Sequence, residues 1–206
     1  MLFKYDLRKN HAFNFCFLIA WTLATYVLPN KIVWLPPREV GLTFIDSLIP
    51  LNSHWIWVYI SYYPFIFLPF LLSPNLKSRK ILFSSFVFAT GVAFFLFFLF
   101  PTTISRELYP LYVTNWSDSI LYLIRSSDES TNCIPSMHVA SSLIAALTFC
   151  YEGKKRGTLA LFWFLMISYS TMATKQHYFY DFVTGAAYGA FCWSFCFYNL
   201  KKLKEI

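Results

Sequence analysis

Residues 81–101 read ILFSSFVFATGVAFFLFFLFP and contain no charged side chain. At about 1.5 Å of rise per residue, a helix of this length crosses the roughly 30 Å hydrocarbon core of a bilayer. The stretch therefore predicts a membrane-spanning helix. The whole chain agrees with this prediction, since 57% of its 206 residues are hydrophobic, 22% are aromatic and only 13% are charged. This composition excludes a disordered, coiled-coil or collagen-like chain.

Six segments, including the one quoted, are apolar enough to be predicted as membrane spans. They cover residues 12–28, 54–72, 81–101, 136–151, 158–173 and 179–200. We expect an all-α fold in which these segments form a polytopic bundle of six transmembrane helices. No linker divides the chain, so residues 1–206 are predicted to form a single domain. The first segment lacks the small-residue cleavage site of a signal peptide, and we interpret it as an uncleaved anchor.

The basic residues are distributed unevenly between the two sides of this predicted bundle. Six spans place both termini and the loops at residues 73–80 and 152–157 on one side. That side carries twelve of the 17 Lys and Arg residues, namely Lys4, Arg8, Lys9, Lys77, Arg79, Lys80, Lys154, Lys155, Arg156, Lys201, Lys202 and Lys204. Cytoplasmic loops are rich in Lys and Arg, so both termini are predicted to be cytoplasmic. The net charge of +7 then reflects topology, and nucleic acid is not an expected partner.

The loops on the other side, residues 29–53 and 102–135, are longer and each contains a short amphipathic pattern. The patterns are VGLTFIDSLI at residues 40–49 and SDSILYLI at residues 117–124. Such patterns are typical of helices that lie in the membrane interface, and we predict one in each loop. The shortness of the chain favours a bacterial inner membrane as its location.

Gly185 and Gly189 stand four residues apart in the last predicted span. This spacing of small residues lets two helices approach each other closely. The partner helix is expected within the bundle, and a homodimer contact through the same two glycines is left open.

The sequence KQHYFYDF places a histidine and an aspartate at the outer end of the last span. His177 and Asp181 are four residues apart and therefore share one face of a helix. The carboxylate can accept the proton of one imidazole nitrogen and leave the other nitrogen free as a nucleophile. Alternatively, the two polar groups only satisfy each other. Ionisable residues within a membrane span are costly, however, and the default interpretation there is functional.

A second histidine stands at the outer end of the fourth span, in the sequence CIPSMHVA. Pro135 suits the start of a helix, whose free backbone N–H groups and positive dipole end favour an anion. Ser136 adds a hydroxyl donor at this position, and His138 is placed to protonate a leaving oxygen above the same anion. The alternative is a capped helix with an interfacial histidine.

The two motifs, PSMH at residues 135–138 and STMATKQHYFYD at residues 170–181, resemble known ones. They are similar to the second and third motifs of the type 2 phosphatidic acid phosphatase superfamily, usually written P-S-x-H and S-R-x5-H-x3-D. Within that superfamily the chain most resembles the branch of inositol phosphorylceramide synthase, in which the third motif reads H-Y-x-x-D. The resemblance covers about residues 100–190.

The resemblance implies a metal-independent phosphoryl transfer without a cofactor. In it His177 attacks phosphorus, Asp181 orients His177, and His138 protonates the leaving alcohol and then activates the acceptor. A membrane lipid is the implied substrate, at an active site on the non-cytoplasmic side. The physical interpretation agrees, because phosphoryl transfer needs chiefly positioning and cations on the nonbridging oxygens.

The cations that bind the phosphate differ from the family pattern. In the first motif, K-x6-R-P, Arg106 matches the arginine, but Leu99 stands at the lysine position and Glu107 at the proline position. In the third motif Thr171 replaces the arginine. Lys175 is our candidate replacement. The phosphate-binding residues are thus predicted to be Arg106, Ser136 and Lys175, with Arg125 kept in reserve as a charge that faces solvent or lipid headgroups.

A zinc site is the competing interpretation of His138, His177 and Asp181, because two imidazoles and a carboxylate can hold this metal. The nearby cations Arg106 and Lys175 favour an anion instead, and no metal is predicted.

The leading prediction is a lipid phosphatase that hydrolyses a lipid phosphate or prenyl diphosphate at the outer leaflet through a phosphohistidine. Its close rival is a transferase that passes a phospho-headgroup to a lipid hydroxyl, as inositol phosphorylceramide synthase or sphingomyelin synthase does. A third class is a non-enzymatic small transporter or scaffold with polar residues along a pathway. The polar residues gather at one outer rim, which argues against a continuous route.

Overall fold

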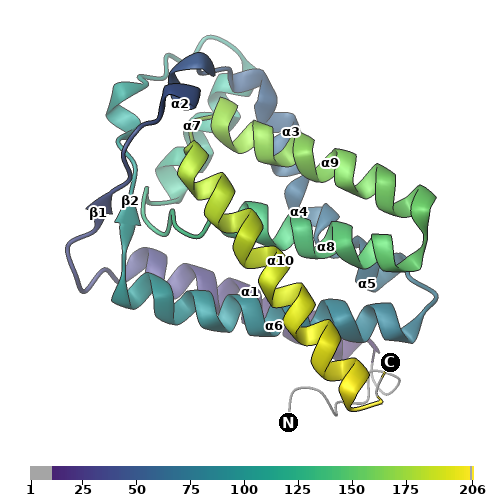
Figure 1. The fold of residues 1–206 in the computed structure, drawn as a ribbon. Coiled ribbons are helices and arrows are strands. Elements are labelled where there is room, and N and C mark those ends of the chain that lie inside the picture. Colours follow the sequence, from purple (N-terminus) through teal and green to yellow (C-terminus); the bar gives the residue numbers. More distant parts are fainter. Residues whose placement is uncertain (1–10, 205) are drawn as a thin grey trace.

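The computed structural model describes residues 11–204 and residue 206, and the described chain is mostly helical (Figure 1). The five long helices are α1 (His11–Lys31), α6 (Leu76–Leu99), α8 (Met137–Glu152), α9 (Lys154–Ala173) and α10 (Phe179–Lys202). They occupy five of the six predicted spans, with shifts of a few residues at their ends. Lys4, Arg8 and Lys9, which were predicted to lie on the cytoplasmic side, are outside the described residues.

Shorter elements fill the connections between the long helices. The short helices are α2 (Phe44–Leu48), η2 (Ser53–Trp55), α3 (Ile56–Ile60), α4 (Tyr62–Phe65), α5 (Leu68–Leu72), η3 (Arg106–Leu108) and α7 (Trp116–Ser127). Two-residue strands, β1 (Arg38–Glu39) and β2 (Thr102–Thr103), pair in parallel and join the loops at residues 29–53 and 102–135. Helices α2 and α7 are the helices predicted at residues 40–49 and 117–124, and both expose large apolar side chains such as Phe44 and Trp116.

The second predicted span, residues 54–72, is not one continuous helix but the series α3, α4 and α5. Pro64 lies in α4, and Pro69 is the second residue of α5. Proline has no backbone N–H and its ring collides with the carbonyl one turn earlier, so each proline interrupts the helical hydrogen bonds. Hydropathy alone does not reveal these breaks.

Two of the described helices, residues Ala12–Lys31 of α1 and α6, are long and apolar enough to cross a membrane, judged by length and composition. Helix α8 has only 16 residues, and α9 begins with the charged sequence KKR. Six spans and cytoplasmic termini therefore stay predictions, and the structure itself supports a mostly helical chain with two candidate spans.

The long helices pack around one apolar core (Figure 1). Helices α8 and α9 form a hairpin, α10 crosses α8 and α6, and α1 lies along α6. A Cβ atom at Gly185 would stand 2.6 Å from the Ser136 carbonyl oxygen, and one at Gly189 2.6 Å from that of Ala140. The two glycines thus let α10 lie directly on α8 within the chain. A homodimer contact through them is untested, but α8 already covers this surface.

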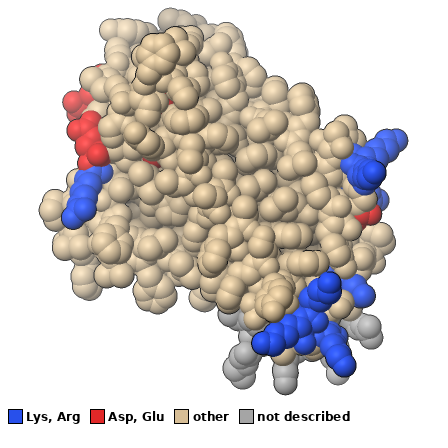
Figure 2. Space-filling model, viewed as in Figure 1, with Lys and Arg blue, Asp and Glu red and all other residues tan. Residues whose placement is uncertain are grey.

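The charged side chains gather at the ends of the molecule (Figure 2). On the face shown, Lys and Arg cluster where α8 turns into α9 and where α10 ends, while a wide surface between the ends carries no charge. The exposed basic residues of these two ends are Lys154, Lys155, Arg156, Lys201, Lys202 and Lys204. Uncharged middles with charged ends are typical of proteins that cross a bilayer.

Candidate active site

His138 lies in the first turn of α8. Ser136 is the N-cap of this helix, and its hydroxyl accepts a hydrogen bond from the Val139 N–H at 3.4 Å. Ser136 is fully buried against Gly185 of α10. The side chain predicted to bind phosphate therefore caps the helix that carries His138, and its hydroxyl hydrogen is not used by the cap.

His177 lies in a tight turn between α9 and α10. The carbonyl of Thr171 accepts hydrogen bonds from the N–H groups of Gln176 at 2.9 Å and His177 at 3.1 Å. Lys175 has a positive φ of 54°, the left-handed conformation that reverses the chain at this point. Thr171, which stands where the family motif has arginine, thus fixes the turn through its backbone.

Asp181 occupies the first turn of α10. Its Oδ2 atom accepts the N–H of Tyr178 at 2.8 Å, as the carboxylate of a capping box does. The same oxygen lies 3.3 Å from Nδ1 of His177. Asp181 is fully buried, and its Oδ1 has no hydrogen-bond partner among the described residues.

The three predicted catalytic side chains form a connected chain of hydrogen bonds. Nδ1 of His138 lies 3.3 Å from Nε2 of His177, and Nδ1 of His177 faces Asp181. Both histidines are only 6% exposed. The carboxylate behind Nδ1 makes Nδ1 the protonated atom and leaves the lone pair of Nε2 directed toward His138. An imidazole held in this way is a suitable nucleophile.

Arg106 binds Gln176, the residue that precedes His177 in the turn between α9 and α10. Its Nη2 atom donates to Oε1 of Gln176 at 2.7 Å, and its Nη1 atom donates to the carbonyls of Asp128 at 2.6 Å and Arg125 at 3.2 Å. Three buried donors here have no acceptor among the described residues: Nε of Arg106, Nε of Arg125 and Nε2 of Gln176. Buried donors are rarely left unpaired, so this cluster fits a ligand rich in acceptors.

The charges around Arg106 also favour an anion. Burial, together with the nearby charge of Arg106, lowers the pKa of Arg125 to about 10, so the Arg125 guanidinium is positive at neutral pH. Asp128 is the acidic partner of Arg106 at 3.8 Å, and burial raises the pKa of this carboxyl group. Two cations and one carboxylate leave a net positive charge, which a phosphate group would neutralise.

A family model described as the PAP2 superfamily matches residues 38–195, which is 158 of the 206 residues. The chain belongs to the PAP2 superfamily. The match includes His138, His177, Asp181 and Arg106, and it confirms the superfamily predicted from the two motifs. Neither the curated proteins nor the solved structures contain a match to this chain. Membership in the PAP2 superfamily supports a phosphatase-type or phosphotransferase-type enzyme.

Lys175, predicted to bind phosphate in this PAP2 chain, is engaged elsewhere. Its side chain is 1% exposed, and its Nζ atom donates to the carbonyl oxygens of Asp46 at 2.9 Å and Ile49. Nζ also lies 4.4 Å from the centre of the Tyr109 ring. Burial lowers the pKa of this amine, against the opposing effect of Asp46. These contacts tie the turn of His177 to α2, and they suit an anchor better than a phosphate ligand.

Several residues of the site were not predicted from the sequence. Tyr59 of α3 contacts Nε2 of His138 at 2.9 Å, Gln176 binds Arg106, and Asp46 of α2 accepts the N–H of Phe179 at 2.8 Å. Tyr59 is 79 residues from His138 in the chain. Motif spacing gives no signal for such a pair, because only the packing of α3 against the site brings the two residues together.

Cys133 also lies beside two of the predicted catalytic residues, His177 and Asp181. The ligand atoms of Cys133, His177 and Asp181 are all within 4.8 Å of one another, so the group could hold a metal ion. Metals bind the thiolate form of cysteine. Burial and the charge of Asp181 raise the pKa of Cys133 well above its usual range, and the thiol donates to the Ser130 carbonyl at 3.2 Å. Binding of a metal ion by this group would therefore release the proton of the thiol.

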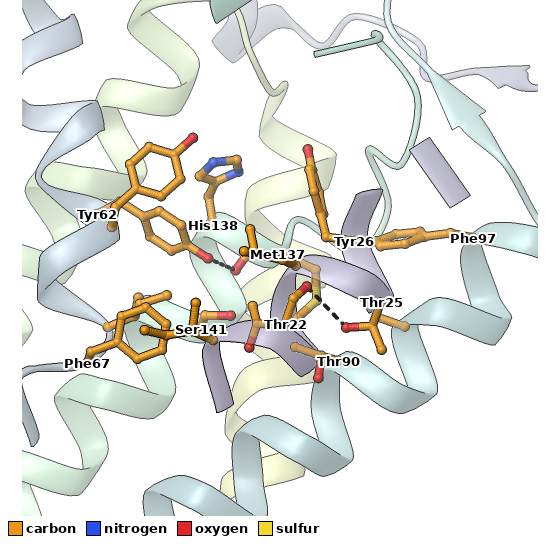
Figure 3. Close-up of a pocket in the computed structure, with 15 residues that line it drawn as sticks. Thr22, Thr25, Tyr26, Tyr62, Phe67, Thr90, Phe97, Met137, His138 and Ser141 are labelled. Carbon is orange, nitrogen blue, oxygen red and sulfur yellow. Dashed lines mark hydrogen bonds between the residues drawn. The ribbon is translucent and has the colours of Figure 1, made fainter. Parts of the chain in front are cut away.

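An apolar pocket opens beside His138 (Figure 3). It lies between α1, α4, α6 and α8. The side chains around it are mostly apolar or aromatic, with a few hydroxyl groups; those labelled with His138 in Figure 3 include Tyr26, Tyr62, Phe67, Phe97 and Met137. A pocket of this kind accommodates an alkyl chain, and His138 stands at its wall.

Proposed function

We propose that this PAP2 protein is a membrane lipid phosphatase that hydrolyses a lipid phosphate or prenyl diphosphate. The observation that carries the proposal is the connected set of His138, His177 and Asp181, with His138 Nδ1 3.3 Å from His177 Nε2. The unpaired donors around Arg106 supply the second half of the site, since they suit the nonbridging oxygens of a phosphate.

The reaction follows from the roles of the two histidines. Nε2 of His177 attacks phosphorus, and the bond from phosphorus to the leaving oxygen breaks. The leaving oxygen takes a proton from Nδ1 of His138 in its charged form. A water molecule then gives a proton to Nδ1 and attacks phosphorus, the bond between phosphorus and nitrogen breaks, and phosphate is released. Asp181 stabilises the positive charge that His177 carries in the intermediate.

The lipid part of the substrate is proposed to occupy the apolar pocket beside His138. The leaving alcohol must stand next to His138, because this residue protonates it. An alkyl chain attached to that alcohol then has a matching apolar surface along Tyr62, Phe67 and Phe97. A water-soluble phosphate ester would leave this surface uncovered.

The membrane topology is also part of the proposal. The six segments predicted above cross the bilayer, both termini are cytoplasmic, and the site faces the non-cytoplasmic leaflet. The clusters of Lys and Arg at the α8–α9 turn and at the end of α10 support this orientation. A bacterial inner membrane, expected from the chain length, stays a prediction.

A phosphotransferase of the kind found in the inositol phosphorylceramide synthase branch is the second candidate. The residue that activates the acceptor, His138, lines the apolar pocket and is largely shielded from water. A lipid alcohol in this pocket would compete with water for the phosphohistidine. The two functions share every residue and differ in the acceptor.

The proposal is tested by incubating the purified protein, reconstituted in vesicles, with a panel of lipid phosphates, with and without ceramide or diacylglycerol. Mass spectrometry identifies the products. We expect phosphate release that His177→Ala abolishes. His54→Ala is the matched control, because this exposed histidine contacts Ser117 and not the site.

Near-normal turnover by His177→Ala would exclude this residue as the nucleophile. A phospholipid product that forms only when the alcohol is added would favour the transferase function over the phosphatase function.

A further inference from the structure

Tyr59 of α3 contacts Nε2 of His138, the ring nitrogen that is not bonded to His177. Its hydroxyl oxygen lies 2.9 Å from Nε2 of His138, and the two ring centres are 4.8 Å apart. Tyr59 is 1% exposed. Of the described residues, it is the one with a hydrogen bond to this nitrogen. The reaction described above uses Nδ1 of His138 and gives Nε2 no role, so the function of this buried contact has to be sought separately.

The hydrogen bonds from Tyr59 to Asp181 form one continuous series, and the carboxylate at its end fixes their direction. An ionised carboxylate only accepts, so Nδ1 of His177 donates to Asp181. Nε2 of His177 then accepts from Nδ1 of His138. A neutral imidazole has one N–H, so Nε2 of His138 accepts, and the Tyr59 hydroxyl donates to it. When His138 is neutral, its proton therefore lies on Nδ1, toward the nucleophile. The charged form that the reaction uses carries a second proton on Nε2, which the Tyr59 oxygen accepts.

We infer that Tyr59 is a positioning residue that keeps Nδ1 of His138 directed at the reacting atoms in each protonation state. This inference rests on the proposed function. A hydroxyl can donate and accept, so it stays bonded to Nε2 when His138 takes up a proton from solvent on Nε2, and again when the proton on Nδ1 passes to the leaving oxygen. After the transfer, His138 keeps its hydrogen on Nε2, bonded to Tyr59, and the lone pair of Nδ1 is free to activate water.

The two histidines thus have partners suited to different tasks. The carboxylate of Asp181 stabilises positive charge on His177, which the covalent intermediate needs. The uncharged phenol of Tyr59 orients His138 without holding it in the charged form, which suits a group that must both give and take a proton. The substrate must also separate the two imidazoles, because its phosphorus and leaving oxygen come between them. Tyr59 then remains as the anchor of His138.

The test compares two substrates with the same alkyl tail: dodecyl phosphate and a dodecyl-substituted nitrophenyl phosphate. An alkoxide leaves only when protonated, whereas nitrophenolate leaves without a proton. Tyr59→Phe removes the hydroxyl and keeps the ring. We expect kcat/KM to fall roughly 10- to 100-fold for dodecyl phosphate and less than about threefold for the nitrophenyl ester, as part of a general-acid contribution of about 10²–10⁴.

Tyr188→Phe is the matched control, since it removes a buried hydroxyl that donates to the Ala89 carbonyl at 2.6 Å. This control should lower kcat/KM for both substrates equally or leave both values unchanged. Tyr59→Phe should also produce a burst of nitrophenol, because the later activation of water by His138 is slowed while the first step is not. Equal losses on both substrates, or no loss on either, would overturn the inference. A wild-type protein that hydrolyses neither ester would contradict the proposed function instead.

Discussion

Asp181→Asn tests the role of the carboxylate behind the nucleophile. Asparagine has the same shape, and its side-chain oxygen can still accept the N–H of Tyr178, which Asp181 accepts at 2.8 Å. What is lost is the negative charge facing Nδ1 of His177 at 3.3 Å. A hydrogen bond to a charged group contributes about 1.5–3 kcal/mol. At about 1.4 kcal/mol per tenfold change in rate, kcat should fall roughly 10- to 100-fold.

The assay is release of phosphate from vesicles that contain the preferred lipid phosphate. Asp118→Asn is the matched control, because Asp118 is the equivalent capping carboxylate of α7 and has no bond to either catalytic histidine. Both variants weaken one helix cap, so their effects on stability should be similar. The reasoning is refuted if Asp181→Asn keeps more than half of the wild-type kcat, or if both variants lose activity to the same extent.

Three further predictions concern packing, pH and metals. Gly189→Ala should be less stable than Gly91→Ala by about 1–3 kcal/mol in detergent unfolding. The new Cβ at position 189 meets Ala140 backbone atoms at 2.6 Å, whereas the one at position 91 meets only the Trp21 ring at 3.4 Å. Equal stabilities would contradict the close packing of α10 on α8. Hydrogen bonds from Ser53 and Thr114 lower the pKa of Asp118 to about 2, whereas its pKa in the unfolded chain is about 4. The ionised carboxylate therefore stabilises the folded protein above about pH 4, and this stabilisation should disappear as the pH falls from about 4 to 2. Unfolding curves of the wild type and Asp118→Asn should converge over this interval, and a constant difference would refute the assignment. Chelators should leave turnover unchanged, whereas a loss that zinc restores would favour the metal site of Cys133, His177 and Asp181.

The sequence predicted the positions of the long helices better than their continuity. Apolar runs mark α1, α6, α8, α9 and α10 within a few residues. The break between α3 and α5 was missed, because residues 54–72 are apolar throughout and hydropathy does not register the effect of Pro64 and Pro69. Tyr59, which contacts His138, lies in the first of these short helices, α3.

The proximity of the three predicted catalytic residues could be expected from the sequence, because their motifs are local. His177 and Asp181 are four residues apart and their side chains meet, but His177 lies in the turn before α10 and not on a helix face shared with Asp181, as the spacing had predicted. The PSMH motif places His138 at a helix start. The partners from distant segments were not predictable in this way. Lys175 shows the limit most clearly: its position two residues before His177 suggested a phosphate ligand, but the left-handed turn directs its amine toward the carbonyls of Asp46 and Ile49.

The central claim, that His177 becomes covalently phosphorylated, is tested most directly by trapping the intermediate. The wild type is quenched in alkali after brief mixing with a lipid phosphate labelled with ³²P, and the labelled peptide is sequenced by mass spectrometry. We predict one label, on His177, that is stable in alkali and lost in acid, and that is absent from His177→Ala. A label on another residue, or turnover without any labelled protein, would contradict the account.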